Sequence, residues 1–203
     1  MLKQRLITIA LLLPFFVWGI FGLSTPHFAL LLAAMVLLGA WEWAALMGLS
    51  HLRRLPYLIG VIFAMMACAW LIAQPVPRMI LLVFMLIWWI FALWLIRDFQ
   101  REDRVPVWML GGGRAGGHPA HPWLFGLLGF IVLVPCWAVI TFLHGGIDGS
   151  GRALVFMLML LVWGADSGAY IVGRLWGRTR LAAHVSPGKT WEGVYGALAA
   201  AVM

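Results

Sequence analysis

Charged residues are scarce in this chain. Lys, Arg, Asp and Glu together make up 10% of its 203 residues, whereas 64% are apolar. Soluble globular domains carry about 25% charged residues, so the composition excludes that class. Only two cysteines occur, Cys68 and Cys136, and they form no Cys-x-x-Cys pair. A disulfide framework and a cysteine-based metal site are therefore excluded, and both cysteines are expected to pack as small apolar residues.

Long apolar runs are what the chain has instead. A membrane-spanning helix needs about 20 mostly apolar residues, and six stretches approach that length: Leu6 to Leu23, Phe28 to Leu49, Leu55 to Ala73, Met79 to Ile96, Trp123 to Leu143 and Ala153 to Gly173. A seventh begins near Trp191 and is still apolar at Met203, so we expect a longer native protein. The predicted fold is all-α: a polytopic transmembrane helix bundle of six complete spans plus the start of a seventh.

Basic residues lie mainly on one side of this predicted bundle. Of the 14 Lys and Arg residues, only Arg78 and Arg152 fall on the side opposite the N-terminus. Because cytoplasmic loops carry the excess of Lys and Arg, the N-terminus is predicted to be cytoplasmic, with the protein in the plasma membrane. The basic residues are spread over several short loops, so nucleic acid is not an expected partner.

The loop over residues 97–122 divides the predicted single membrane domain, residues 1–203, into two parts. Residues 1–122 form a four-span part, and residues 123–203 carry the candidate site. Within the loop, the run from Gly111 to Gly117 is typical of a flexible linker. His118 and His121 lie on the same segment and are expected to be solvated rather than to bind a metal.

A carboxylate stands inside the sixth apolar stretch. An ionised side chain at that depth costs about 2.5–3.5 kcal/mol by insertion scales, which indicates a specific use for Asp166. If the stretch is helical, Trp163, Asp166, Ser167 and Tyr170 share one polar face. The interpretations that stay open for Asp166 are an interhelical hydrogen bond and a role in a polar binding cavity.

Small residues follow the same helix. Gly164 and Gly168 form one pair at a spacing of four, and Ala165, Ala169 and Gly173 extend a second. This pattern lets transmembrane helices approach closely, so the helix is predicted to lie centrally in the bundle.

Glu42 is the other acidic residue within the six predicted spans, and Trp41 and Trp43 flank it. Its helix runs in the same direction as that of Asp166, so the two carboxylates are expected at similar depth. Two interpretations stay open: a cavity shared with Asp166, or an interfacial carboxylate beside tryptophans that favour the headgroup region.

The segment from Gly177 to Glu192 is basic and rich in hydroxyl groups. Ser186 is a favoured N-cap residue and Pro187 a favoured first helical residue, so the sequence predicts that a helix starts here. Helix N-termini bind anions, and Ser186, Lys189 and Thr190 are expected to converge on a phosphate. The alternative is an interfacial helix cap with basic membrane anchors.

Two motifs with similar letters are excluded. Gly188-Lys189-Thr190 looks like the end of a P-loop, but the required first glycine is replaced by Ala183 and no strand is predicted before it. Ser186 and Lys189 have the spacing of the nucleophile motif of penicillin-binding enzymes, yet they are predicted to lie on the wrong face of the membrane.

Three segments together resemble a known family. They are WGADSGAY (Trp163 to Tyr170), GRLWG (Gly173 to Gly177) and VSPGKTWEG (Val185 to Gly193), supported by AWEW at Ala40 to Trp43. They closely resemble the phosphatidate cytidylyltransferases, also called CDP-diacylglycerol synthases. The resemblance implies transfer of the cytidylyl group from CTP to phosphatidate, which gives CDP-diacylglycerol and pyrophosphate. This reaction would take place at the cytoplasmic face of a bacterial inner membrane and would require Mg²⁺.

The resemblance also implies site residues. Asp166 and Lys189 would be catalytic, and Ser186, Lys189 and Thr190 would contact the CTP phosphates. Asp166 is the candidate metal ligand. Arg174, Arg178 and Arg180 would bind the lipid phosphate or simply anchor the protein to headgroups. A homodimer is one assembly that this resemblance leaves open.

One element of the family pattern has no counterpart in these 203 residues. It is a C-terminal region that supplies the principal metal-binding aspartates, so this stretch of chain is expected to be catalytically incomplete. The alternative functions are a CTP-dependent lipid or polyprenol kinase and a non-enzymatic membrane transporter or assembly subunit.

Overall fold

A computed structural model describes residues 13–102, 122–146, 149–182 and 186–202. Its helices are α2 (Thr25–Leu46), α3 (His51–Ala73), α4 (Pro75–Glu102), α5 (Pro122–Gly145), α6 (Gly151–Trp176) and α7 (Trp191–Val202), and its strands are β1 (Arg180–Ala182) and β2 (Ser186–Thr190). A shorter apolar helix, Leu13–Gly22, precedes them.

Five helices, α2 to α6, are long and apolar enough to cross a membrane. They confirm the second to sixth predicted apolar stretches as helices, with ends that differ by a few residues. The first predicted span lies partly outside the described residues. Its described portion, Leu13–Gly22, is helical. The chain is thus a largely helical, multi-span membrane protein, and the count of six spans stays a prediction.

The chain divides into two compact units. Unit 1 comprises residues 1–85 and 107–155, and unit 2 comprises residues 86–106 and 156–203. The boundaries fall within α4 and near the start of α6. The division predicted from the loop at residues 97–122 stays a prediction. Each unit is described here by itself.

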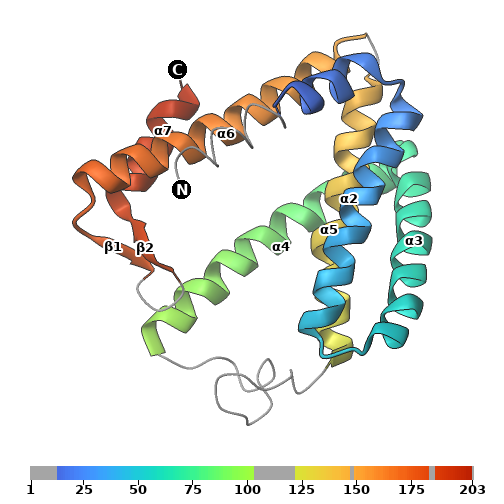
Figure 1. The fold of residues 1–203 in the computed structure, drawn as a ribbon, viewed down its shortest axis with the longest axis horizontal. Helices are drawn as coiled ribbons and strands as arrows, with labels where there is room; N and C mark the ends of the chain where they lie inside the picture. Colours follow the sequence, from blue (N-terminus) through green and yellow to red (C-terminus); the bar gives the residue numbers. More distant parts are fainter. Residues whose placement is uncertain (1–12, 103–121, 147–148, 183–185, 203) are drawn as a thin grey trace. The chain divides into compact units, whose positions relative to one another are not determined.

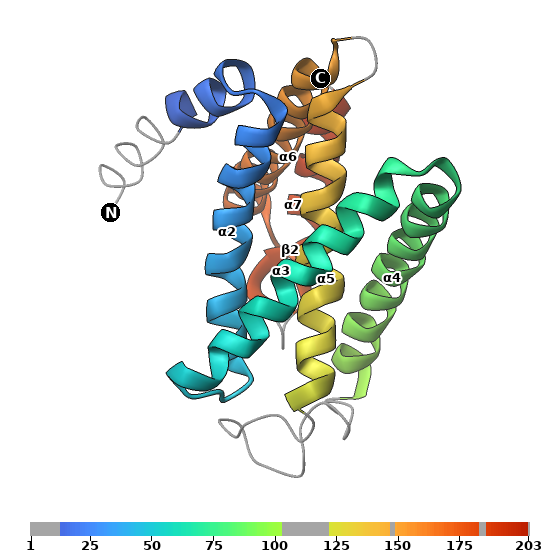
Figure 2. The same cartoon turned by 90° about the vertical axis from the view of Figure 1, so that its right-hand side faces the viewer.

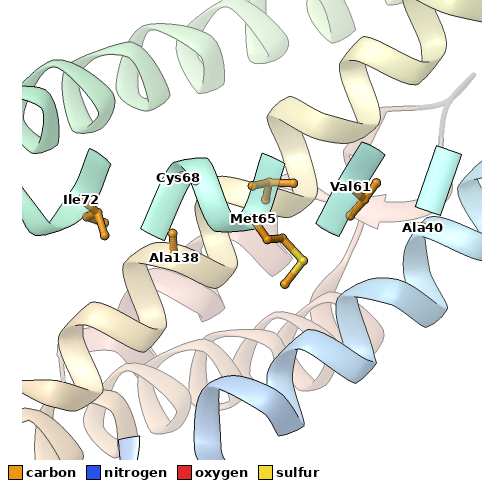
Figure 3. Packing of buried hydrophobic residues seen from close by; sticks show 7 residues of the cluster. Ala40, Val61, Met65, Cys68, Ile72 and Ala138 are labelled. Carbon is orange, nitrogen blue, oxygen red and sulfur yellow. The ribbon is translucent and has the colours of Figure 1, made fainter. Parts of the chain in front are cut away.

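Unit 1 is built on three helices, α2, α3 and α5, that pack against one another (Figure 2). Val61, Met65, Cys68 and Ile72 recur at helical spacing along one face of α3, and they meet Ala40 of α2 together with Val134 and Ala138 of α5 (Figure 3). Cys68 is buried in this cluster, as predicted, and Cys136 is half-buried.

Two aromatic side chains attach α2 and α3 to the start of α5. The indole N–H of Trp43 donates to the carbonyl oxygen of Phe125 at 2.8 Å, and the hydroxyl of Tyr57 donates to that of Gly126 at 3.2 Å. The two rings lie against Gly129, where an added Cβ would collide with both. Their polar groups are thus satisfied inside the apolar bundle, where an unmade hydrogen bond is costly.

Unit 2 contains the helical hairpin of α6 and α7 (Figure 1). A Cβ added to Gly168 would lie 2.6 Å from the carbonyl oxygen of Gly196, and one added to Gly196 would lie 2.6 Å from that of Gly168. The two backbones therefore touch where neither residue has a side chain. This contact confirms that the small residues of the sixth stretch serve close helix packing.

Strands β1 and β2 form an antiparallel pair between α6 and α7, in unit 2 (Figure 1). The predicted all-α bundle is thus supported in its helices, which make up most of the described chain, whereas the basic segment is a short β-hairpin rather than part of a helix. The strands are short, with three and five residues, and Pro187 is tolerated because a strand of a two-stranded sheet has one edge without a partner.

The glycine contact yields a stability prediction. Gly168→Ala would force its new methyl group against backbone and the Cβ of Ala200, 2.7 Å away, and should destabilise the protein by about 1–3 kcal/mol, the usual cost of overpacking. Gly164→Ala is the matched control, because its nearest neighbour would be the carbonyl oxygen of Ala200 at 3.9 Å. Thermal unfolding in detergent should show a lower midpoint for the first variant only; equal midpoints would contradict the contact.

Candidate functional site

The basic segment that the sequence singled out is the β1–β2 hairpin together with its connections to α6 and α7. Arg180 pairs with Thr190, and Ala182 pairs with Ser186. The backbone N–H of Trp191 then donates to the carbonyl oxygen of Thr179 at 2.9 Å. These contacts bring the residues just after α6 next to the residues that begin α7.

The helix predicted to start at Ser186 starts instead at Trp191, so this prediction is wrong. Residues Ser186–Thr190 form strand β2, because their backbone pairs with β1 rather than turning into a helix. Thr190 takes the role of N-cap: its Oγ1 accepts from the N–H of Gly193 at 3.2 Å. The side chain of Thr190 also fits against Gly173 of α6 and Gly177 just after it, where a Cβ would reach Oγ1 at 3.0 and 2.9 Å.

This placement gives the three residues expected to surround a phosphate different exposure to solvent. Lys189 is exposed, whereas Ser186 and Thr190 are half-buried. The hairpin therefore presents Lys189 outward while it turns Thr190 toward α6.

Glu192 has a carboxylate that is engaged by backbone N–H groups. Both carboxylate oxygens lie 3.2 Å from the backbone nitrogen of Thr179. The residue lies in the first turn of α7, beyond the five long apolar helices. Its own backbone N–H, with those of Arg178 and Thr179, holds the pKa of the Glu192 carboxyl below its usual value.

Three arginines accompany the hairpin. Arg174 lies in the last turn of α6, where its Nη1 donates to the hydroxyl of Tyr170 at 2.9 Å, one turn earlier. Arg178 lies between α6 and β1, and Arg180 is the first residue of β1. All three side chains are exposed. With Lys189 they give this end of unit 2 a positive charge that anionic groups can approach.

Three of the four residues of the predicted polar face, Asp166, Ser167 and Tyr170, are exposed on α6, and the fourth, Trp163, is half-buried. Gly168 and Gly173 turn toward α7. Glu42 is also exposed, but it belongs to α2 in unit 1. A cavity shared by Glu42 and Asp166 stays a prediction.

The described residues do not form a metal site by themselves. No group of three or more His, Cys, Asp or Glu side chains gathers within the described ranges. Asp166 lies on α6, and the oxygens of Glu192 already accept from backbone N–H groups. Mg²⁺ commonly binds through one or two carboxylates together with substrate phosphates and water, so Asp166 stays a predicted ligand that would need those further oxygens. The run Gly111 to Gly117, His118 and His121 lie outside the described residues.

A cavity of about 400 Å³ lies in unit 1, and none of the predicted site residues lines it. Its lining is mostly apolar and comes from α2, α3, α5 and the turn after α5, including Ala69, Trp137 and Phe142. None of the acids or basic residues assigned above contributes to it.

Glu192 is the residue whose structural role the sequence interpretation missed. From the sequence, Glu192 counts with Asp166 as one of two acids within the candidate site, out of seven in the chain. A glutamate in the first turn of a helix is itself a signal of hydrogen bonding to free N–H groups. The partner at Thr179, 13 residues earlier, could not be read from that signal because it depends on the hairpin.

The elements described so far define a class: a multi-span membrane protein with an exposed basic β-hairpin between two closely packed helices. A profile of the cytidylyltransferase family matches residues 3–203. Phosphatidate cytidylyltransferase from Pseudomonas aeruginosa is 40% identical over 200 residues, which is 98% of this chain and 67% of that protein. The Haemophilus influenzae protein of the same name is 30% identical over 217 residues, covering 100% of this chain and 71% of that protein.

The chain belongs to the cytidylyltransferase family, and its enzyme class is accordingly that of the nucleotidyltransferases. A shorter match of 51 residues, 49% identical, is found with phosphatidate cytidylyltransferase from Mycobacterium leprae. No solved structure matches the chain significantly.

The cap at Thr190 gives a second stability prediction. Thr190→Val removes the Oγ1 that accepts from Gly193 and should destabilise the protein by about 1 kcal/mol, typical for loss of an N-cap. Thr190→Ser keeps the acceptor and serves as control. Chemical unfolding followed by circular dichroism should place the serine variant nearer the parent; the reverse order would reject the cap.

The Glu192 carboxyl predicts a pH dependence of stability. Because its folded-state pKa is lowered, the ionised group stabilises the fold above the pKa of the unfolded chain. That contribution is lost as pH falls through the folded-state pKa. Glu192→Gln should therefore narrow the gap in unfolding midpoint between neutral and acidic buffer. A gap as wide as in the parent protein would show that Glu192 makes no such contribution.

Proposed function

We propose that this chain acts as a phosphatidate cytidylyltransferase, which converts CTP and phosphatidate into CDP-diacylglycerol and pyrophosphate. Membership of the cytidylyltransferase family and two relatives of that name, each aligned over nearly the whole chain, support the proposal. The observation that carries it is the exposed basic hairpin beside long apolar helices, because the reaction joins a charged nucleotide to a membrane lipid.

The chemistry is a displacement at phosphorus. A phosphate oxygen of phosphatidate forms a bond to the α-phosphorus of CTP, and the bond from that phosphorus to the oxygen bridging to the β-phosphate breaks. Pyrophosphate leaves with the electron pair. Such transfers depend mainly on positioning and on stabilising negative charge, and exposed Lys189, Arg178 and Arg180 suit both tasks.

Lys189 is assigned to the CTP phosphates because its ammonium projects from the hairpin as an exposed point charge. Ser186 and Thr190 stay secondary candidates, since the oxygen of Thr190 is engaged as an N-cap. Arg174, Arg178 and Arg180 are assigned to the lipid phosphate or to headgroups. Arg174 carries a further contact with Tyr170, which holds its guanidinium at the end of α6.

Asp166 is proposed to line the polar cavity in which the reacting groups meet. A Mg²⁺ requirement, implied by the resemblance, is part of the proposal for the enzyme. The described residues do not form the site for that ion, so no step here is routed through it. The N-terminus and the hairpin are proposed to face the cytoplasm of a bacterial cell, and a homodimer stays a prediction.

The decisive experiment determines which phosphate of CTP is transferred to the lipid. The native protein that contains these residues is reconstituted into vesicles that contain phosphatidate and is given CTP labelled at either its α- or its γ-phosphate. Transfer of the α-label into lipid, with release of pyrophosphate, supports the proposal. Transfer of the γ-label would identify a CTP-dependent lipid kinase instead. No label in lipid, with protein shown to be folded, would reject both activities and favour a transporter or assembly subunit.

Lys189 provides the residue-level prediction. Lys189→Ala should weaken CTP binding about tenfold or more, since a hydrogen bond to a charged group contributes about 1.5–3 kcal/mol. Arg53→Ala is the control, because it removes one exposed positive charge near the start of α3 in unit 1. Binding of CTP is measured by titration at fixed salt. Equal affinities for parent and Lys189→Ala would remove Lys189 from the site.

A further inference from the structure

We infer that Glu192 is a positioning residue for nucleotide binding: it holds the segment before β1 against the start of α7, and thereby sets the arrangement of the basic hairpin. The inference rests on the proposed function, since it concerns how the same hairpin binds CTP. It assigns to Glu192 a role distinct from that of a phosphate ligand or a metal ligand.

The first support is geometric. Thr179 is held from both of its backbone groups: its N–H donates to the Glu192 carboxylate at 3.2 Å, and its carbonyl oxygen accepts from the N–H of Trp191 at 2.9 Å. Two consecutive residues of α7 thus bind one residue of the connection from α6. This pair of contacts closes the base of the hairpin, next to the pairing of Arg180 with Thr190.

The second support is the placement of the basic side chains around this closure. Arg178 directly precedes Thr179, Arg180 directly follows it, and Lys189 lies three residues before Glu192. The two arginines are therefore attached to one side of the Thr179–Glu192 contact, and the lysine is attached to the other. When the Thr179–Glu192 contact opens, the base of the hairpin no longer fixes the distance between the two arginines and the lysine.

The third support is charge. A glutamate beside several arginines and a lysine could pair with them and reduce their attraction for phosphate. Here both carboxylate oxygens of Glu192 accept from one backbone N–H, that of Thr179. The fixed amide dipole stabilises the anion, so the guanidinium and ammonium groups stay available to the triphosphate.

A metal-ligand role is the alternative to positioning. The Glu192 carboxylate is held by the Thr179 N–H, and the described residues offer no cluster of three ligands around it. Mg²⁺ is commonly held by one or two carboxylates together with substrate phosphates, so the magnesium dependence of the variants decides between the two roles. A carboxylate held against the backbone serves positioning better than coordination.

Loss of this contact should affect nucleotide binding more than lipid binding. Several cations must meet the phosphates of one CTP molecule together, and misplacement by about 1 Å can cost up to about 100-fold. Phosphatidate is already concentrated in the bilayer and needs fewer simultaneous contacts. The expected signature is a higher KM for CTP, with the KM for phosphatidate little changed.

The test compares Glu192→Ala, Glu192→Gln and Glu192→Asp in the native protein that contains these residues, reconstituted into vesicles with phosphatidate. Glu192→Ala should raise the KM for CTP about tenfold. Glu192→Gln keeps one amide oxygen as an acceptor for Thr179 and should recover part of that loss. Glu192→Asp keeps the charge but is one methylene shorter, so it should recover less than Gln. Glu102→Gln, at the end of α4, is the charge-matched control.

The magnesium dependence is measured in the same variants, and each outcome is decisive. An increased KM for CTP at saturating magnesium, with the order Ala above Asp above Gln, supports positioning. An unchanged KM for CTP overturns the inference while leaving the proposed function intact. An effect that raised magnesium removes would make Glu192 a metal ligand and also overturn it. Absence of cytidylyl transfer by the parent protein would reject the proposed function itself.

If Glu192→Ala fails to fold, Glu192→Gln decides by itself, together with hydrogen exchange at the Thr179 amide. Faster exchange at Thr179 with a raised KM for CTP supports the inference. Faster exchange with unchanged KM would show that the contact is structural only, and would overturn it.

Discussion

The close approach of α6 and α7 is the constraint on which the candidate site depends. Helices in a bilayer gain little from apolar burial against each other, so packing between small residues has to hold them together. Gly168 and Gly196 allow their backbones to touch, and Gly173 and Gly177 leave space for Thr190. The hairpin is attached to both helices, so its two ends are placed by this contact.

The polar contacts of unit 2 are built on that packing. Thr190 caps α7 and Glu192 binds Thr179, so one short segment satisfies a free N–H group at the start of α7 and another in the connection that follows α6. Among the described residues, neither side chain pairs its oxygen atoms with a neighbouring cation. The exposed arginines and Lys189 consequently retain the charge that suits a phosphate-rich nucleotide.

Unit 1 meets the demands of the bilayer in a different way. Its core is a row of apolar side chains on α3 packed between α2 and α5, and its aromatic donors find backbone carbonyls across the helices. Trp43 of α2 therefore packs against α5, although its position beside Glu42 in the sequence suggested that its side chain lies in the headgroup region. Glu42 itself lies exposed on α2.

The sequence by itself determined the membrane class, the helical apolar stretches, the small-residue face of α6 and the family, because hydrophobic length and spacing are local properties. It also singled out the basic segment and its candidate site residues, whose roles stay proposals. Only the tertiary structure decided that this segment is a β-hairpin, that Thr190 rather than Ser186 caps α7, and that Glu192 binds Thr179. Those outcomes depend on backbone groups distant in sequence, and side-chain propensity at Ser186 and Pro187 could not override the strand pairing that satisfies them.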